Sequence, residues 1–191
     1  MKKFLTILIL IFTLPTPSQA DDIRDLMIEK ISVGDSLLNF YSKEQIEHNK
    51  DFIYKNKKFA SFSEHNPSKF ERFDLIQVHF KNNDNKYKIY SITGTIFFAN
   101  DMPGCMKKKD TVINDISDLV KNAKRKDEAG KHQYDKSGKS LYWSNYFIFD
   151  SGDKIDTSCT DWSPPINWRD RFKLSITLKE LRDFINFEAY K

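Results

Sequence analysis

Apolar and polar residues alternate along several short stretches of the chain, a pattern typical of β-strands with one buried face. Ile76, Val78 and Phe80, for example, share one side of a stretch whose other side carries Gln77 and His79. Gly94 lies on the apolar side of another such stretch, where we expect a bulge or a closely crossing helix. The pattern predicts five strands, at residues 72–80, 87–98, 141–149, 153–160 and 171–176.

A different spacing follows the second predicted strand. Apolar residues recur there every three or four positions, which predicts a long amphipathic helix over residues 103–123. Pro103 suits the first position of such a helix, because the backbone N–H group that proline lacks would find no partner within the helix there.

Two capping motifs predict shorter helices near the ends of the chain. Ser42 and Gln45 fit a capping box that opens a helix ending near Asn49, and Thr177 and Glu180 fit a second one. Strands joined by short polar turns favour antiparallel pairing. We therefore expect an α+β fold: an antiparallel sheet of about five strands packed on one long helix, with short N- and C-terminal helices.

The first twenty residues have the pattern of a secretory signal. Lys2 and Lys3 precede an apolar run over residues 4–14, which is too short to span a bilayer. Small residues before the predicted cut place cleavage between Ala20 and Asp21. The expected protein is a single domain, residues 21–191, that reaches the periplasm or the exterior by the general secretory route and has no transmembrane span after cleavage.

The chain has two cysteines, Cys105 and Cys159. An even number of cysteines in an exported protein favours a disulfide, whose alternatives are two buried thiols or a metal pair. A metal site would need further ligands at suitable spacing, and the four histidines are not placed that way. We expect a disulfide and no cofactor.

The net charge of the mature protein indicates whether nucleic acid is an expected partner. The formal net charge of +4 becomes +2 once Lys2 and Lys3 are removed, so the mature protein is close to neutral. Nucleic acid is therefore not an expected partner.

Two neighbouring features form the candidate binding surface. Trp162 and Trp168 flank a proline-containing loop and could stack on a sugar or dock a protein, or instead fold back over the edge of the sheet. A basic stretch, read as an irregular loop over residues 124–140, would attract an anionic polymer or an acidic protein, or be merely solvated. Its candidate residues are Lys124, Arg125, Lys126, Lys131 and His132.

Three segments carry a family resemblance: residues 31–46, 87–98 and 135–140. Together they resemble small secreted proteins of unknown function from AT-rich marine alphaproteobacteria, which implies a periplasmic location and no defined activity. Residues 31–46 also resemble the outer-membrane assembly lipoproteins of the SmpA/OmlA type, which implies an interaction role in the envelope. The chain departs from those lipoproteins in lacking their lipid-bearing cysteine and a Gly-x-Pro step after the helix.

Signatures of catalysis are sparse. The serine-hydrolase elbow G-x-S-x-G and the zinc motif H-E-x-x-H do not occur, and His79 within a strand is more typical of a sheet residue than of a base. We therefore expect a non-enzymatic binding or interaction module of the cell envelope, whose partner is an envelope protein or an anionic polymer. The alternative is a small periplasmic hydrolase acting on cell-wall or carbohydrate material.

Overall fold

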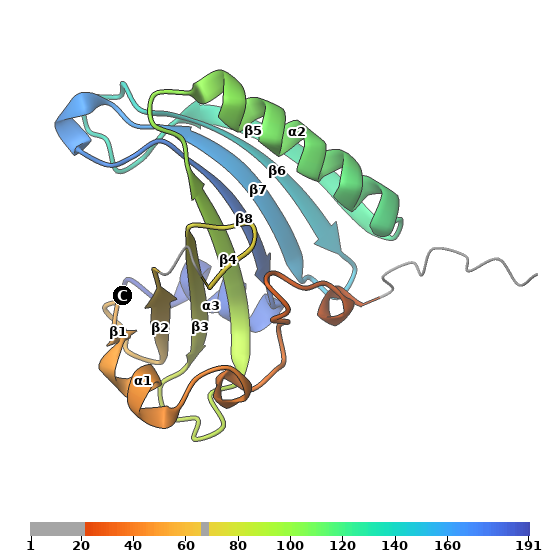
Figure 1. Ribbon diagram of the computed structural model, residues 1–191, viewed down its shortest axis with the longest axis vertical. Helices are drawn as coiled ribbons and strands as arrows, with labels where there is room; N and C mark the ends of the chain where they lie inside the picture. Colours follow the sequence, from red (N-terminus) through yellow and green to blue (C-terminus); the bar gives the residue numbers. More distant parts are fainter. Residues whose placement is uncertain (1–21, 66–68) are drawn as a thin grey trace, which may run out of the picture.

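A single antiparallel sheet of eight strands dominates the computed structural model, which describes residues 22–65 and 69–191 (Figure 1). The predicted signal, with its cut between Ala20 and Asp21, lies outside the described residues. The strands follow one another across the sheet in the order β1-β2-β3-β4-β8-β7-β6-β5. Their bounds are β1 Lys50–Asp51, β2 Phe59–Glu64, β3 Leu75–Lys81, β4 Ile89–Phe97, β5 Ala123–Lys131, β6 Leu141–Phe149, β7 Lys154–Asp161 and β8 Arg171–Thr177.

Three α-helices accompany the sheet in the described part of the chain. They are α1 Lys43–His48, α2 Met102–Leu119 and α3 Lys179–Phe187. The capping box that opens α1 is confirmed, because the Ser42 hydroxyl accepts from Gln45 N and the Gln45 side chain accepts from Ser42 N. The second box is wrong: α3 has Leu178 at its N-cap, and no side chain caps it.

The predicted fold class is wrong. The molecule is mainly β, with eight strands and three short helices, rather than an α+β sheet of about five strands packed on one long helix. Strand β5 occupies the first half of the charged stretch predicted as an irregular loop over residues 124–140, and the sequence pattern did not indicate it because an exposed edge strand carries polar residues on both faces. Strand β2 escaped because neighbouring residues are buried on both faces, which removes the alternation.

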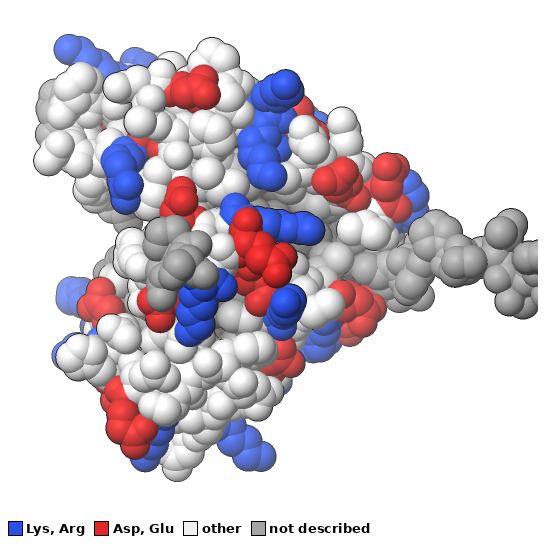
Figure 2. All heavy atoms as spheres, in the orientation of Figure 1, with Lys and Arg blue, Asp and Glu red and all other residues white. Residues whose placement is uncertain are grey.

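The charges on the surface are mixed. Figure 2 shows acidic and basic side chains side by side over the described part of this view, without a large area of one sign. No helix within residues 22–65 and 69–191 has the length and apolar character that crossing a bilayer requires.

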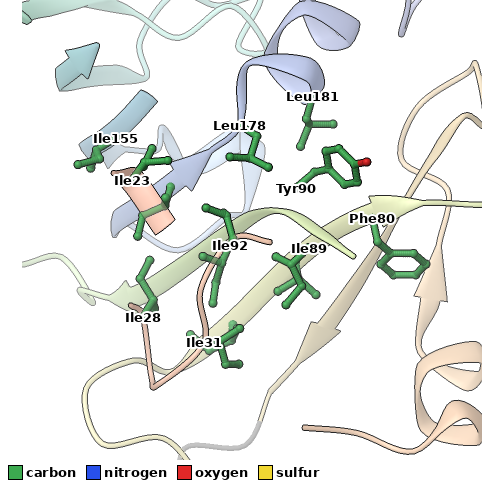
Figure 3. Close-up of a cluster of buried hydrophobic side chains, with 14 of the residues drawn as sticks. Ile23, Ile28, Ile31, Phe80, Ile89, Tyr90, Ile92, Ile155, Leu178 and Leu181 are labelled. Atoms are coloured by element: carbon green, nitrogen blue, oxygen red, sulfur yellow. The ribbon is translucent and has the colours of Figure 1, made fainter. Parts of the chain in front are cut away.

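Most of the hydrophobic core lies on one face of the sheet, which we call the apolar face, and a smaller part formed by Tyr54, Phe59 and Phe184 of α3 covers the opposite face around His79. On the apolar face helix α2 packs on β7 and β8, and the segment that precedes β1 covers β3 and β4 (Figure 1). Figure 3 shows Ile23 and Ile28 of that segment beside Ile92 of β4 and Ile155 of β7. Each of these four side chains is buried, so the core joins both halves of the sheet.

The predicted disulfide is confirmed. Cys105 in the first turns of α2 is bonded to Cys159 of β7, with a Cα–Cα distance of 6.1 Å. Both residues are fully buried. The bond fastens the helix to the apolar face.

Gly94 lies where the chain leaves no room for a larger side chain. The residue is regularly paired in β4, and neither a bulge nor a helix occurs at it. The ring of Phe73 crosses it so closely that a Cβ atom would lie 2.5 Å from Phe73 Cδ1. Gly94→Ala should therefore lower the free energy of unfolding by roughly 1–3 kcal/mol, the usual cost of overpacking a core. Urea denaturation checks this, and Gly94→Ala combined with Phe73→Leu should recover part of the loss. An unchanged denaturation midpoint for Gly94→Ala would contradict it.

Candidate binding site

Over strands β5 to β8 the face of the sheet opposite α2 is polar. Side chains alternate between the two faces of a strand, so Cys159 and Phe172 on the apolar face leave Ser158, Arg171 and Lys173 on the other. Pairing between β7 and β8 sets Thr160 beside Arg171 and Ser158 beside Lys173. Two cations and two hydroxyl groups therefore share one small area of the sheet.

A pocket of about 430 Å³ opens over this area, and we call it the polar pocket. Its walls come from strands β5 to β8 and from the loop between β5 and β6. The lining residues are Glu128, Lys131, His132, Gln133, Tyr142, Ser144, Tyr146, Asp156, Ser158, Thr160, Arg171, Lys173 and Ser175. Every one of them carries a polar group, which is the composition of a site for a hydrophilic ligand.

Arg171 and Lys173 are the unusual members of this lining. Neither forms an ion pair with a described residue, and Arg171 Nε is buried without a hydrogen-bond partner. Burial lowers the pKa of Lys173 to about 8, assisted by the charge of Arg171 and opposed by Asp156. Burial also lowers the pKa of Arg171. These pKa shifts follow from two cations that have lost water without gaining a counterion.

Asp156 supplies an acid on the neighbouring strand. Its Oδ2 lies 3.5 Å from Lys154 Nζ, while its Oδ1 is buried without a hydrogen-bond partner. Burial raises the pKa of this carboxyl group. An unpartnered carboxylate oxygen thus lies close to the two unpaired cations.

Aromatic rings form one rim of the pocket. Trp162 is buried and packs against His132 at 4.3 Å between ring centroids, and its other neighbour, Trp168, meets it edge-on at 4.6 Å. Tyr134 is 57% exposed and Trp168 is 50% exposed. Their centroids are 6.3 Å apart. We call Trp168 and Tyr134 the aromatic rim; Trp162 supports it from below.

Arg171 joins the rim to the pocket. Its guanidinium carbon lies 5.2 Å from the ring centroid of Trp162 and 5.7 Å from that of Trp168. Cation–π contacts of this kind orient the guanidinium group without neutralising its charge. Arg171 therefore remains available to an anion.

The two loops that carry the rings are fastened together by Asp135. Its Oδ2 accepts hydrogen bonds from Ser140 N and Oγ at 2.8 Å and from Ser163 Oγ at 2.7 Å. Hydrogen bonds from Ser137 and from these serines hold the pKa of Asp135 well below its usual range. Figure 1 shows the β5–β6 and β7–β8 loops side by side at one end of the sheet. The rim is therefore fixed by a charged carboxylate rather than by packing alone.

The structure divides the residues predicted for the binding surface. Trp162, Trp168, Lys131 and His132 lie at the polar pocket or its rim. The other three are on β5, and each has an acidic partner. The pairs are Lys124–Asp150 at 3.7 Å, Arg125–Asp127 at 2.8 Å and Lys126–Glu128 at 3.3 Å. Residues 124–131 of the basic stretch therefore belong to a strand on which these three cations are paired, and residues 132–140 form the loop to β6.

Sequence reasoning missed Arg171, Lys173 and Asp156. A signal for them was present, because β7 and β8 both alternate apolar residues with polar ones that include charges. Alternation identifies the face on which such residues lie, and their enclosure depends on loops that only the folded structure places.

His79 lies on the same face of the sheet as the polar pocket, in β3. It is buried, and neither ring nitrogen has a hydrogen-bond partner in the described structure. Burial, with a smaller contribution from Lys173, lowers its pKa to about 4. Its ring lies 5.8 Å from that of Tyr54. His79 is therefore a neutral ring at neutral pH and is not oriented by an acid.

A larger cleft, of about 610 Å³, lies on the apolar face between α2 and the N-terminal segment. Met27, Val112 and Ile116 contribute to its mainly apolar walls. At its rim Lys30 pairs with Glu71 at 3.6 Å. The cleft lacks the convergence of unpartnered polar groups found in the polar pocket, so the candidate site is the polar pocket.

Comparison of the chain with family models, curated proteins and solved structures found no match. Function is therefore inferred from the residues of the polar pocket and its rim.

Proposed function

We propose that the protein is an exported, non-enzymatic binding module of the cell envelope that binds a saccharide at the aromatic rim and the polar pocket. The observation that carries this proposal is the position of two exposed rings, Trp168 and Tyr134, beside a pocket lined throughout by polar groups. A sugar ring presents C–H groups that pack on aromatic faces and hydroxyl groups that need hydrogen-bond partners. The rim and the pocket supply these two kinds of contact.

Two observations support export. The N-terminal twenty residues have the layout of a secretory signal, and the Cys105–Cys159 disulfide is of the kind that persists outside the reducing cytoplasm. The envelope of the producing cell is then the nearest source of saccharide, which makes a cell-wall glycan the first ligand to test.

His79 and His132 do not support the alternative function, a hydrolase. A hydrolytic base needs an oriented ring or carboxylate beside the reacting atoms. Both ring nitrogens of His79 lack partners among the described residues. His132 packs against Trp162, and its pKa is lowered mainly by burial. Neither histidine is therefore held as an oriented base.

We expect the purified protein to sediment with insoluble peptidoglycan, and Trp168→Ala to weaken that binding about tenfold. The reason is that removing an exposed indole deletes the apolar platform of the site, and tenfold corresponds to about 1.4 kcal/mol. Trp168→Phe should retain most of the binding, since it keeps a ring.

The matched control is Phe187→Ala, which removes a more exposed ring, 63% against 50% for Trp168, from α3 outside the polar pocket. It should leave sedimentation unchanged. Absence of binding by the unmodified protein, or equal binding by Trp168→Ala, would contradict the proposed function.

A further inference from the structure

We infer that the saccharide is acidic and that Arg171 and Lys173 bind its carboxylate inside the polar pocket. This inference rests on the proposed function and adds to it a chemical class of ligand. It is carried by the geometry of the pocket, in which two cations without ion pairs lie beside hydroxyl groups.

Arg171 and Lys173 lack counterions among the described residues. A partly buried cation without a counterion is unfavourable, and a bound anion relieves that cost. Lys124, Arg125 and Lys126 of β5 have acidic partners within 4 Å, whereas Arg171 and Lys173 have none among the described residues. The missing negative charge would therefore come from the ligand.

The geometry of the two cations also favours a carboxylate. Arg171 and Lys173 are two positions apart on β8, so both side chains project from the same face. A guanidinium group offers two parallel donors to a carboxylate, and an ammonium group adds a point charge. Thr160 and Ser158, their register partners on β7, place hydroxyl groups beside them. One carboxylate can thus be bound from several sides.

Other residues of the polar pocket favour an acidic sugar over a simple anion. Asp156 and Glu128 also line the pocket, and they would repel a second or third negative charge. Tyr142 and Tyr146 add two more hydroxyl groups to the lining. A monoanionic, hydroxyl-rich ring matches this set, and inorganic phosphate does not.

The experiment compares a tetramer of galacturonic acid with its fully methyl-esterified form, in a titration followed by tryptophan fluorescence or calorimetry. The two probes share their sugar rings and differ only at the carboxyl groups, which are charged in the acid and neutral methyl esters in the other. We expect the unmodified protein to bind the acid at least about tenfold more tightly than the ester, and added salt to reduce that difference. This comparison needs no mutant.

Single substitutions then test whether Arg171 and Lys173 are the cations that bind the carboxylate. Arg171→Gln and Lys173→Met should each weaken binding of the acid about tenfold and leave any binding of the ester unchanged. Lys173→Arg, which keeps the charge, should restore much of the loss. The matched controls are Arg125→Gln and Lys124→Met, which remove the same kinds of charge from β5 outside the pocket lining. They should bind both probes like the unmodified protein.

Three results would overturn the inference. They are equal binding of acid and ester, unchanged binding of the acid by both pocket variants, and displacement of the acid by an equal concentration of inorganic phosphate. In each case sedimentation with peptidoglycan and its dependence on Trp168 would still test the proposed function separately. Failure of that sedimentation together with no detectable binding of either oligosaccharide would reject both.

Discussion

Replacing both cysteines by serine, Cys105→Ser with Cys159→Ser, is expected to lower the free energy of unfolding by about 4 kcal/mol. The bond closes a loop between positions 54 residues apart, and loop-closure entropy in the unfolded chain predicts a loss of this size. Both residues are fully buried between α2 and β7, so the loss of packing adds to the effect. Urea denaturation of the oxidised protein and of the double variant measures it.

The control for this experiment is a reductant. Dithiothreitol should lower the denaturation midpoint of the unmodified protein toward that of the double variant and leave the double variant unchanged. If oxidised protein and double variant unfold at the same urea concentration, the disulfide does not stabilise the fold.

The second large effect concerns pH. His79 has a pKa of about 4 in the folded protein, mainly because it is buried, against an ordinary value of 6.5 in the unfolded chain. Above pH 6.5 the residue is neutral in both states and its effect on stability is constant. Between pH 6.5 and pH 4 the unfolded chain takes up the proton and the folded protein does not, so stability falls with falling pH. The loss reaches about 3 kcal/mol near pH 4 and then levels off.

Urea denaturation at pH 7.5 and pH 4.5 tests this expectation on three proteins. His79→Phe should lose less stability between the two pH values than the unmodified protein, because its ring does not titrate and can still pack on Tyr54. His48→Gln, which removes an exposed histidine at the end of α1, is the control and should follow the unmodified protein. The carboxyl groups titrate alike in all three, so an equal loss in His79→Phe would contradict the assignment.

Part of this fold follows from local pattern. Alternating residues predict strands close to β3, β4, β6, β7 and β8, and the apolar spacing around Ile113 and Ile116 predicts α2. The disulfide follows from two cysteines and the expectation of export. These features depend on neighbouring residues or on compartment, so the sequence contains enough information to predict them.

Other features depend on distant parts of the chain. The first of these is β2, which is buried because β1 and β3 flank it, while its own residues show no alternation. Similarly, Lys173 appears in the sequence as a solvent-facing lysine of a half-buried strand. Its enclosure comes from the curvature of the sheet and from the β5–β6 loop, which is anchored by Asp135. Tryptophan is a rare residue type, so the sequence indicated Trp162 and Trp168 as candidate binding residues. Arginine and lysine are common, so it did not indicate Arg171 and Lys173.

Strand β5 has a consequence for the behaviour of many copies of the protein together. It is the last strand of the sheet, so one side of its nine-residue backbone faces no neighbouring strand. Such an edge is a template on which another copy could add a strand and begin to aggregate. Apart from two alanines and a glycine, however, every residue of β5 is charged. Bringing two such edges together would force desolvation of dense, already paired charges, so the strand that looked like a docking site instead discourages self-association.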